Sequence, residues 1–495
     1  MSFDDELLGK REDLLARGIS LYPYSYERSH DLSELRAHQD ELMDQEVRVA
    51  GRLVGYRGAG RLIFVDLRDQ RERIQVLLSR SEFDDDTWDL IRKGLDLGDW
   101  LGVAGIVCRT RTEELSVDAR EVRVLAKAVV RVPIIKSGAS AELSPEVRYR
   151  QRYLHWITDP EARAVVVRRA RIIAAIRRFL DGRGFLEVTT PTLEMSYGGA
   201  EARPFTTEIQ ALSNHQAFLR ISPELPLKRF IVGGFEKVYT ICQNFRNEGI
   251  DRSHNPEFTM LEWYEAYTDY HYQMEQFESL VSAVAEEVTG SSKVVYRGQE
   301  IDFTPPWKRL TILDGLKERG VDASSLDDEA LKGELDKRGL EPPVPYSWGH
   351  AVAELFGEIV EPQLTQPTFV CDHPRDTSPL TKRKRGDDRL VERFEPVVCG
   401  MELGNAYSEL TDPVEQRERF LQQRELGADR EGVEHHPVDE DFLKAIGCGM
   451  PPTGGVGLGI DRLVMLLTDS PSIRDVIAFP MMRSLTDEEA DREES

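Results

Sequence analysis

The chain has few cysteines and no long apolar run. Its 495 residues include 5 cysteines, which are widely spaced and odd in number. That usage argues against a disulfide framework or a paired-cysteine zinc site and favours free thiols in a reducing cytoplasm. No run reaches the roughly 18 apolar residues that a membrane-spanning helix needs, and the acidic N-terminus lacks the apolar segment of a secretory signal. We therefore expect a cytoplasmic protein with no membrane segment.

Positive charge is also scarce. The sequence holds 64 Lys and Arg against 88 Asp and Glu, which gives a formal net charge of −24. This sign is wrong for a protein that binds polyanions through its overall field. Any contact with nucleic acid would have to come from local basic surface and from shape.

Short β-type runs dominate the first part of the chain. Residues 4–17 predict a short amphipathic helix, and a helix-like segment at 85–95 separates three earlier β-type runs from two later ones. The five runs are 47–55, 61–69, 72–80, 100–110 and 114–125. Five short strands with a helix between the third and the fourth are typical of an OB barrel, although the pattern also allows another small β-barrel.

Composition divides the chain into two main folded parts. A stretch with Pro, Gly and Ser ends the barrel region, and a helical stripe of apolar side chains follows, with Gly182 or Gly184 as its stop. The stripe consists of Val166, Ile172, Ile173, Ile176, Phe179 and Leu180. The predicted parts are an N-terminal helical extension (1–45), the OB barrel (46–130), a linker (131–150) and a larger domain (151–495) with a charge-rich insertion at about 288–345.

The segment 245–267 joins an arginine, a polar loop and a strand. Strand alternation places Phe258, Met260, Glu262 and Tyr264 on one face. An acid between aromatic side chains would be costly in a core unless a cation meets it. The segment therefore predicts either a phosphate- and base-binding hairpin, or a sheet with one solvated face and an incidental glutamate.

A glycine-rich segment at 454–467 runs into Arg462 at the head of an apolar helix. Such a turn lets backbone approach a ligand closely, and an arginine there suits phosphate. The segment is neither a GxGxxG fingerprint nor a Walker A loop. Taken alone, such a turn is more often a packing feature.

Seven motifs occur in one order between residues 148 and 467. They are RYRQRYL, GFLEVTTPTL, GGAEARPF, SPELPLKR, FRNEG with HNPEFTMLE, MELGNAYSEL and GLGIDRLVMLL. In this order they resemble the class II lysyl-tRNA synthetases over nearly the whole chain. The resemblance implies an α+β fold: an OB-fold anticodon-binding barrel, then a class II catalytic domain built on a mainly antiparallel sheet flanked by helices. It also implies a homodimer with Pro191 at the interface, and an enzyme that uses ATP to form lysyl-adenylate and transfers lysine to the 3′ end of tRNA(Lys).

The resemblance also implies an ATP site with magnesium. Arg246 is similar to the catalytic arginine that grips the α-phosphate and the substrate carboxylate, Arg462 to the catalytic arginine that holds the γ-phosphate, and Phe258 to the aromatic on which adenine stacks. The other residues expected at the nucleotide are Glu248, His254 and Asn255. Glu395 and Glu402 match the carboxylates that hold Mg²⁺ across the phosphates, and hard oxygen ligands are what this ion prefers.

The amino-acid pocket implied by the resemblance is acidic. Glu224 matches the acid that receives the α-ammonium, and Asn405 the amide near the α-carboxylate. Glu262 and Glu409 match the two acids around the ε-ammonium, with Tyr264 alongside. The pocket is completed by Gly199 and Gly457. A buried ammonium needs paired charge and hydrogen-bond acceptors, whereas two acids would repel the aspartate of the similar aspartyl enzymes.

The barrel has its own match to the family. Arg52, Phe64 and Gln75 stand at the places on the first three strands where the family reads the anticodon. Stacking on an exposed aromatic, together with hydrogen bonds to a splayed base, is how OB folds read single-stranded RNA. The alternative is that Phe64 belongs to the barrel core.

Several positions depart from the family pattern. Pro226 stands where an aromatic is usual and His155 where an acid is usual, and Arg252 precedes His254 by two residues instead of one. Whether Arg252 reaches the triphosphate is therefore open.

The acids of the 401–410 segment do not share one strand face. Asn405 and Glu409 have the same strand parity, but Glu402 does not. If all three face one site, a bulge or bend must lie between them.

Two rival functions share these motifs. One is a paralogue that attaches lysine to a protein side chain, but such paralogues lack the barrel. The other is a non-catalytic RNA-binding relic. A relic should have lost phosphate arginines or magnesium acids, whereas Arg246, Arg462, Glu395 and Glu402 are all present.

Overall fold

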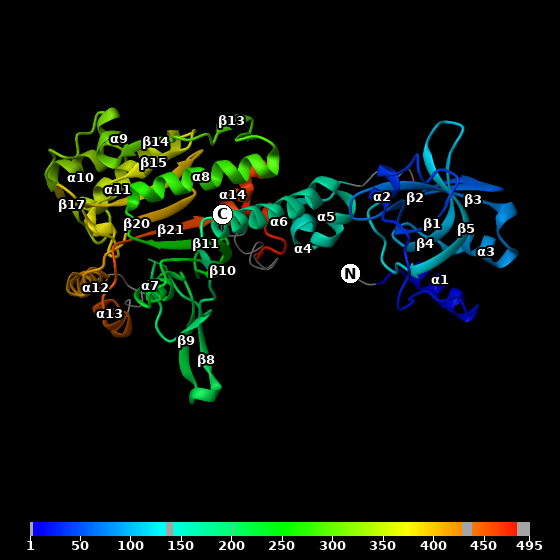
Figure 1. Ribbon diagram of the computed structural model, residues 1–495, viewed down its shortest axis with the longest axis horizontal. Helices are drawn as coiled ribbons and strands as arrows, with labels where there is room; N and C mark the ends of the chain where they lie inside the picture. The colour runs from blue at the N-terminus through cyan, green and yellow to red at the C-terminus, as the bar shows by residue number, and fades with distance from the viewer. Residues whose placement is uncertain (1–2, 135–141, 201, 428–437, 483–495) are drawn as a thin grey trace. The chain divides into compact units, whose positions relative to one another are not determined.

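The computed structural model describes residues 3–134, 142–200, 202–427 and 438–482 (Figure 1). The chain forms two compact units, Met1–Arg163 and Ala164–Ser495. Part of the predicted linker, at 135–141, lies outside the described residues, and its last residues form α4 (Pro145–Arg150), followed by α5 (Arg152–Thr158). In the described parts of the chain, none of the helices combines the length and apolarity needed to cross a membrane.

The first unit contains a closed five-stranded barrel. Its strands are β1 (Glu46–Ala59), β2 (Leu62–Arg68), β3 (Arg73–Ser79), β4 (Trp100–Arg109) and β5 (Leu115–Ala126), in the order β1-β2-β3-β5-β4. All neighbours are antiparallel except β3 and β5. The helix between β3 and β4 is α3 (Asp85–Asp89), which continues into a π-helical turn at Leu90–Gly94. The predicted OB barrel is confirmed.

Two helices precede the barrel strands in the first unit. These are α1 (Asp5–Ala16) and α2 (Leu32–Ala37), and an aspartate caps each N-terminus by accepting a backbone N–H of the first turn. Leu14 and Leu35 from these helices are buried in the same apolar cluster as Ile63, Val65 and Leu67 of β2. The extension therefore belongs to the barrel core.

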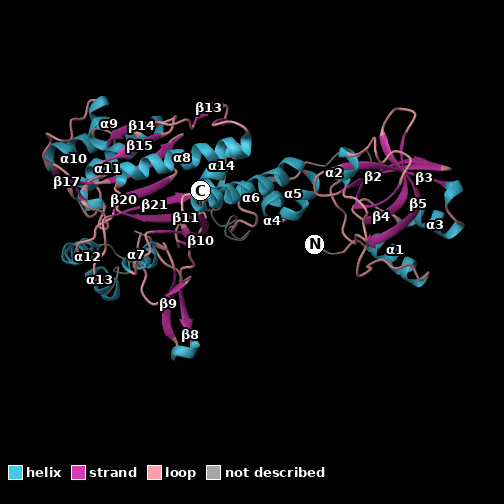
Figure 2. Ribbon diagram, in the orientation of Figure 1, coloured by secondary structure: helices cyan, strands magenta, loops and turns pink. Residues whose placement is uncertain are grey.

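The second unit is built on a large, mainly antiparallel sheet flanked by helices (Figure 2). The strand order is β14-β15-β18-β20-β21-β11-β10-β6, with β19 paired to β18. Its strands are β6 (Leu186–Glu187), β10 (Lys237–Phe245), β11 (Glu257–Ala266), β14 (Lys308–Thr311), β15 (Thr368–Cys371), β18 (Arg393–Val398), β19 (Met401–Glu402), β20 (Gly404–Ser408) and β21 (Thr453–Gly459). The α+β class predicted from the sequence is confirmed.

Three helices cover one face of this sheet. They are α6 (Pro160–Asp181), α8 (Tyr270–Thr289) and α14 (Ile460–Leu467), and their apolar residues pack with Leu261 and Trp263 of β11. Within the predicted α6 stripe, Ile172, Ile176 and Leu180 are buried and Ile173 and Phe179 pack against the core. Val166, which we expected in the stripe, is exposed instead. Val165 packs in its place, because it lies two turns before Ile172 and so on the same helix face.

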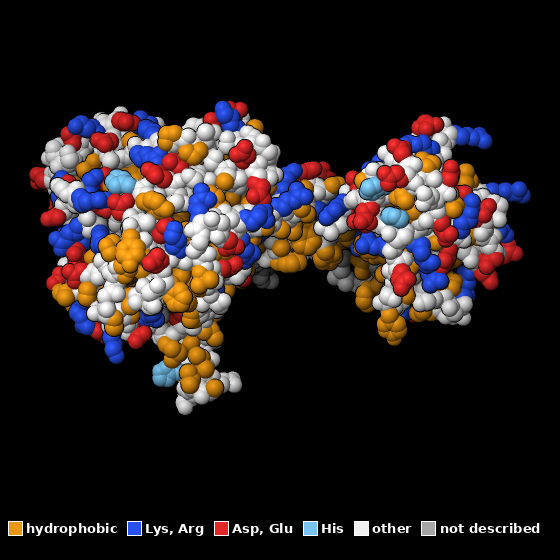
Figure 3. Space-filling model, viewed as in Figure 1, with side chains coloured by type: hydrophobic (Ala, Val, Ile, Leu, Met, Phe, Trp, Pro, Cys, Tyr) orange, Lys and Arg blue, Asp and Glu red, His pale blue; other side chains and the backbone are white. Residues whose placement is uncertain are grey.

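The remaining helices and strands accompany the large sheet. A second small sheet holds β7 (Leu193–Glu194), β9 (His215–Leu219) and β8 (Thr206–Ile209). The region predicted as an insertion contains β12 (Lys293–Tyr296), β13 (Gln299–Asp302), β14, α9 (Ile312–Glu318) and α10 (Asp328–Asp336). The other elements are α7 (Glu224–Val232), α11 (Trp348–Ile359), β16 (Arg383–Lys384), β17 (Asp387–Val391), α12 (Pro413–Gly427), α13 (Glu440–Gly447) and α15 (Ile473–Val476). Figure 3 shows acidic and basic side chains interspersed over the visible face of each unit.

Candidate active site

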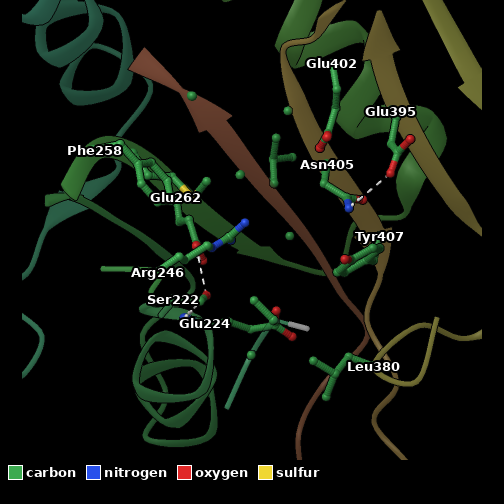
Figure 4. Close-up of a pocket in the computed structure, with 18 of the residues that line it drawn as sticks. Ser222, Glu224, Arg246, Phe258, Glu262, Leu380, Glu395, Glu402, Asn405 and Tyr407 are labelled. Atoms are coloured by element: carbon green, nitrogen blue, oxygen red, sulfur yellow. Dashed lines mark hydrogen bonds between the residues drawn. The ribbon is translucent and has the colours of Figure 1, made fainter. Parts of the chain in front are cut away.

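A cavity of about 410 Å³ lies on the side of the large sheet opposite α6, α8 and α14. Of the residues predicted for ATP, lysine and metal binding, all except Glu409 line it. In Figure 4 the labelled side chains enter the cavity from several elements, among them Glu262 from β11, Glu395 from β18, Asn405 from β20 and Glu224 from α7. The predicted alternation of β11 explains part of this arrangement. Phe258, Met260, Glu262 and Tyr264 line the cavity, whereas Leu261 and Trp263 are buried in the core on the other face.

The glycines of β21 form the floor between two walls. In the sheet register, Gly457 lies between Glu262 of β11 and Asn405 of β20, and Gly455 lies between Tyr264 and Tyr407. A Cβ on Gly457 would meet no protein atom closer than 3.6 Å, so its missing side chain keeps cavity space open. A Cβ on Gly455 would instead lie 2.4 Å from the Tyr264 ring.

Two arginines, Arg246 and Arg462, line the cavity. The Arg246 guanidinium lies 5.1 Å from the centre of the Phe258 ring, and its buried Nε has no acceptor among the described residues. A buried guanidinium donor without a partner suits an anionic ligand, because arginine forms strong paired hydrogen bonds to phosphate and carboxylate. Arg462, at the start of α14, donates to the Glu402 carbonyl, with a 2.5 Å contact.

The loop before β11 brings His254 to Arg462. Asp251 accepts hydrogen bonds from the backbone N–H groups of Ser253 and His254, and its carboxylate lies 2.8 Å from His254 Nδ1. Burial would raise the pKa of Asp251, but these hydrogen bonds outweigh burial and hold the pKa well below its usual range. The other ring nitrogen, Nε2, lies 3.4 Å from Arg462 Nη2. Arg252 is exposed and does not line the cavity in this structure.

Two acids, Glu395 and Glu402, line the cavity (Figure 4), and Glu402 Oε2 lies 3.7 Å from Arg462 Nη1. The enclosed position of Glu402, and then the charge of Glu395, raise the pKa of Glu402. Mutual repulsion of two carboxylates fits a divalent cation between them. The described residues hold no cluster of three metal-ligating side chains.

The strand break expected between Glu402 and Asn405 is present. Glu402 pairs with Val397, and Ala406 pairs with Phe394. Phe394 and Val397 are three positions apart, whereas Glu402 and Ala406 are four positions apart, so one extra residue is accommodated at the β19–β20 junction. This irregularity lets Glu402 and Asn405 line the same cavity despite their opposite parity.

Arg393 and Glu361 were not anticipated from the sequence. Arg393 donates to the Asn405 side chain (3.1 Å) and Ser378 Oγ (2.9 Å) and forms an ion pair with Glu395. Arg393 stands two residues before Glu395 on β18, and strand parity puts both side chains on one face. This spacing could have identified Arg393 as a site residue from the sequence. Glu361 lies near Glu395 and Glu402, and burial together with the charges of these two acids raises the pKa of Glu361 to about 7.

Another part of the cavity is acidic. Glu262 accepts a hydrogen bond from Ser222 Oγ (2.9 Å) and lies 3.3 Å from the Tyr264 hydroxyl, which donates to it. Ser222 in turn accepts the backbone N–H of Glu224, the first residue of α7. Burial, and then the charge of Glu224, raise the pKa of Glu262 to about 8. A carboxylate so destabilised gains most from a cationic ligand.

Glu409 lies behind the cavity wall. It is fully buried, and its carboxylate pairs with Lys228 at 2.5 Å. A Cβ on Gly455, which lines the cavity, would meet Glu409 Oε1 at 2.1 Å. Glu409 is therefore separated from the cavity by little more than the missing side chain of a glycine.

The barrel presents its predicted RNA-contacting residues on its outer surface. Phe64 lies half-buried on the opposite face of β2 from the core residues Ile63 and Val65, so the alternative that it belongs to the core is wrong. Gln75 is paired in register with Asp66, two residues from Phe64. Arg52 lies 4.9 Å from the Trp100 ring centre and donates to the Gly98 carbonyl.

Comparison with known proteins places this architecture in a family. Residues 144–483 match the family model for class II tRNA synthetases (D, K and N), and residues 47–125 match the OB-fold nucleic acid binding domain. The chain belongs to the class II tRNA synthetases of this group. Within it the chain belongs with the lysine–tRNA ligases, since it is 50% identical over 481 residues to the lysine–tRNA ligase of Roseiflexus castenholzii, covering 96% of this chain and 97% of the relative.

Other lysine–tRNA ligases show similar agreement. The protein from Moorella thermoacetica is 48% identical over 480 residues, covering 96% of both chains. The protein from Clostridium perfringens is 47% identical over 468 residues, covering 93% of this chain and 92% of the relative. The similarity therefore extends through both units.

Proposed function

We propose that the chain is a lysine–tRNA ligase, which activates L-lysine with ATP to lysyl-adenylate and transfers the lysyl group to the 3′ end of tRNA(Lys). The reaction releases diphosphate and then AMP. The observation that carries this proposal is the charge pattern of one cavity: Arg462 lies beside Glu402, the buried acids Glu224 and Glu262 line another part of the cavity, and Arg246 lies beside Glu262 (Figure 4). We also propose that the enzyme acts in the cytoplasm, as the cysteine usage predicts.

Activation uses positioning and charge instead of a side-chain nucleophile. The lysine carboxylate attacks the α-phosphate in line, a new C(O)–O–P linkage forms, and the bond to diphosphate breaks. Arg246 is placed to bind both the carboxylate and the α-phosphate, and Arg462 the γ-phosphate. Glu395 and Glu402 would hold Mg²⁺, which supplies charge neutralisation on the phosphates when bound. Arg393 keeps Glu395 and Asn405 in place for these contacts.

Different residues of the cavity hold the nucleotide base and the amino acid. Phe258 offers a stacking face for adenine beside Glu248, His254 and Asn255. For the amino acid, Glu224 receives the α-ammonium and Asn405 lies near the α-carboxylate. Glu262 and Tyr264 lie at the ε-ammonium, Glu409 adds its charge from behind Gly455, and Gly199 and Gly457 leave room for the chain of the substrate. Transfer then follows when the terminal ribose hydroxyl of tRNA attacks the adenylate carbonyl and AMP leaves.

Amino-acid selectivity tests this function. Pyrophosphate exchange with ATP, measured with each standard amino acid, should be fastest with lysine and should depend on magnesium. The reason is that two or more buried acids stabilise an ammonium and repel a carboxylate. Exchange that is faster with aspartate or asparagine than with lysine would show that the pocket assignment is wrong.

We further propose that the protein is a homodimer. The first-motif segment around Pro191 resembles the family interface, and nearby apolar side chains are unusually open: Leu186, Leu193 and Met195 are each about half exposed (50%, 51% and 51%). Multi-angle light scattering at micromolar concentration should therefore give twice the chain mass of 56.4 kDa. An active protein that runs as a monomer would contradict this.

The barrel should matter to tRNA and not to adenylate formation. Phe64→Ala removes a stacking platform worth about 1–3 kcal/mol per base. Charging of tRNA should then fall about 5- to 150-fold, since 1.4 kcal/mol is a factor of ten. Exchange without tRNA should be nearly unchanged, and Phe64→Tyr, which keeps the ring, should charge normally.

A matched control and a changed tRNA sharpen this test. Leu62→Ala removes an exposed apolar side chain two residues earlier on β2, and it should leave charging unaffected. A tRNA with a different central anticodon base should be charged poorly by the wild type and lose little more with Phe64→Ala. Equal losses of exchange and charging would make Phe64 a folding residue. No loss of either would favour the protein-lysylating alternative.

A further inference from the structure

Lys228 is a charged side chain buried inside the acidic end of the site. It lies one turn after Glu224 on α7, and its side chain has no exposed surface. Its Nζ lies 2.5 Å from Glu224 Oε1 and 2.5 Å from Glu409 Oε2. The lysine thus joins an acid that lines the cavity to an acid behind the wall.

The apolar surroundings make this arrangement costly unless it is fully paired. Leu225, Leu227, Ile231 and Phe442 form the adjacent hydrophobic cluster, and Lys228 Nζ lies 6.0 Å from the Phe442 ring centre. Burial alone would lower the pKa of Lys228, but Glu224 and Glu409 outweigh it and keep the ammonium charged. Removing one partner of such a buried pair would leave an uncompensated buried charge, so Lys228, Glu224 and Glu409 depend on one another.

The charge of the pocket points to the role. Glu224 and Glu409 carry two negative charges when ionised, and Lys228, which contacts both, offsets one of them. Without Lys228, two buried carboxylates would face each other and would share a proton or move apart.

We propose that Lys228 is a positioning residue that sets the charge of the amino-acid pocket and holds Glu224 and Glu409 in the geometry that selects lysine. This inference rests on the proposed lysine activation. Lys228 does not line the cavity and acts through the two acids. Ser222 accepts the backbone N–H of Glu224 and donates to the carboxylate of Glu262, so the start of the helix that carries Glu224 and Lys228 is also linked to Glu262.

Two substitutions separate charge from packing. Lys228→Met preserves the aliphatic volume and removes the ammonium, and Lys228→Ala leaves space for a small amine. Both should lower kcat/KM for lysine at least about 30-fold, the lower end for breaking a desolvated charge pair. The KM for ATP and the affinity for a non-hydrolysable ATP analogue should stay within about twofold, because the phosphate end of the cavity lies elsewhere.

Chemical rescue provides a readout that a structural role would not move. n-Propylammonium replaces the atoms missing from Lys228→Ala, so it should restore lysine-dependent exchange at least about fivefold in that variant and not raise it in the wild type. n-Propanol, of the same size without charge, should restore nothing. Rescue by both compounds, an unchanged lysine KM, or joint loss of lysine and ATP-analogue binding would each overturn the proposal. Wild-type protein that fails to activate lysine would instead refute the proposed function.

Discussion

Replacing Glu262 by glutamine should lower kcat/KM for lysine by about 30- to 5,000-fold. This range corresponds to the roughly 2–5 kcal/mol lost when one partner of a buried charge pair is removed. Glu262 is buried, lines the cavity and already uses Ser222 and Tyr264 as hydrogen-bond donors. The amide would keep the shape of the side chain but could not offset the ε-ammonium. Steady-state pyrophosphate exchange at saturating ATP measures the effect directly.

Glu265→Gln is the matched control. It removes an equally buried carboxylate from the same strand, but Glu265 pairs with Lys237 and lies outside the cavity. Its cost should appear in thermal stability and not in the KM for lysine. If the two substitutions affect lysine activation equally, the effect comes from the strand and Glu262 does not contact the substrate.

The pH dependence gives Glu262 a second signature. Because its pKa is raised to about 8, the empty site holds this carboxyl largely protonated at neutral pH. A bound ammonium favours the ionised form, so kcat/KM for lysine should rise with pH up to about 8 and then level. Glu262→Gln should flatten that rise. The pH profile of kcat/KM for ATP, measured at saturating lysine, serves as the reference. If Glu262→Gln left the pH profile for lysine unchanged, Glu262 would not be the group that titrates at the lysine site.

Arg246→Ala should reduce kcat for lysine-dependent exchange by about 10²- to 10³-fold, the loss typical when one preorganised transition-state donor is removed. The buried Nε of this guanidinium has no acceptor among the described residues, and its position over Phe258 aims it into the cavity. Arg246→Lys should recover only part of the rate, because an ammonium cannot make the paired hydrogen bonds of a guanidinium.

The loop arginine Arg252 provides the comparison for Arg246. Arg252 is exposed, and its side chain is not among those that line the cavity. Arg252→Ala should therefore change kcat less than about threefold, in line with a surface substitution that costs under about 0.5 kcal/mol. A loss as large as that of Arg246→Ala would show that the loop closes over the triphosphate when ATP binds and would return Arg252 to the site.

Local patterns accounted for much of the site. The period of two along 258–264 placed four side chains on the cavity face and Leu261 and Trp263 in the core, as the structure shows, whereas Thr259, predicted on the core face, also borders the cavity. The parity mismatch between Glu402 and Asn405 required an irregular junction, and the register contains it. The prediction of the apolar stripe on α6 was less accurate, because Val165 and Val166 are neighbours in sequence and only packing against the sheet distinguishes them.

The sequence by itself determined the order of the motifs, the strand alternation and the chemistry available at each end of the site, because these depend on residue type and on spacing of a few residues. Only the tertiary structure decided which groups meet across the sheet. Glu224 and Lys228 are four residues apart on one helix, so their contact could be anticipated. Their meeting with Glu409, from a segment 181 residues beyond Lys228, could not. The depth at which Glu409 is buried depends on Gly455 and Tyr264 of other strands, and burial sets the strength of every charge in the pocket.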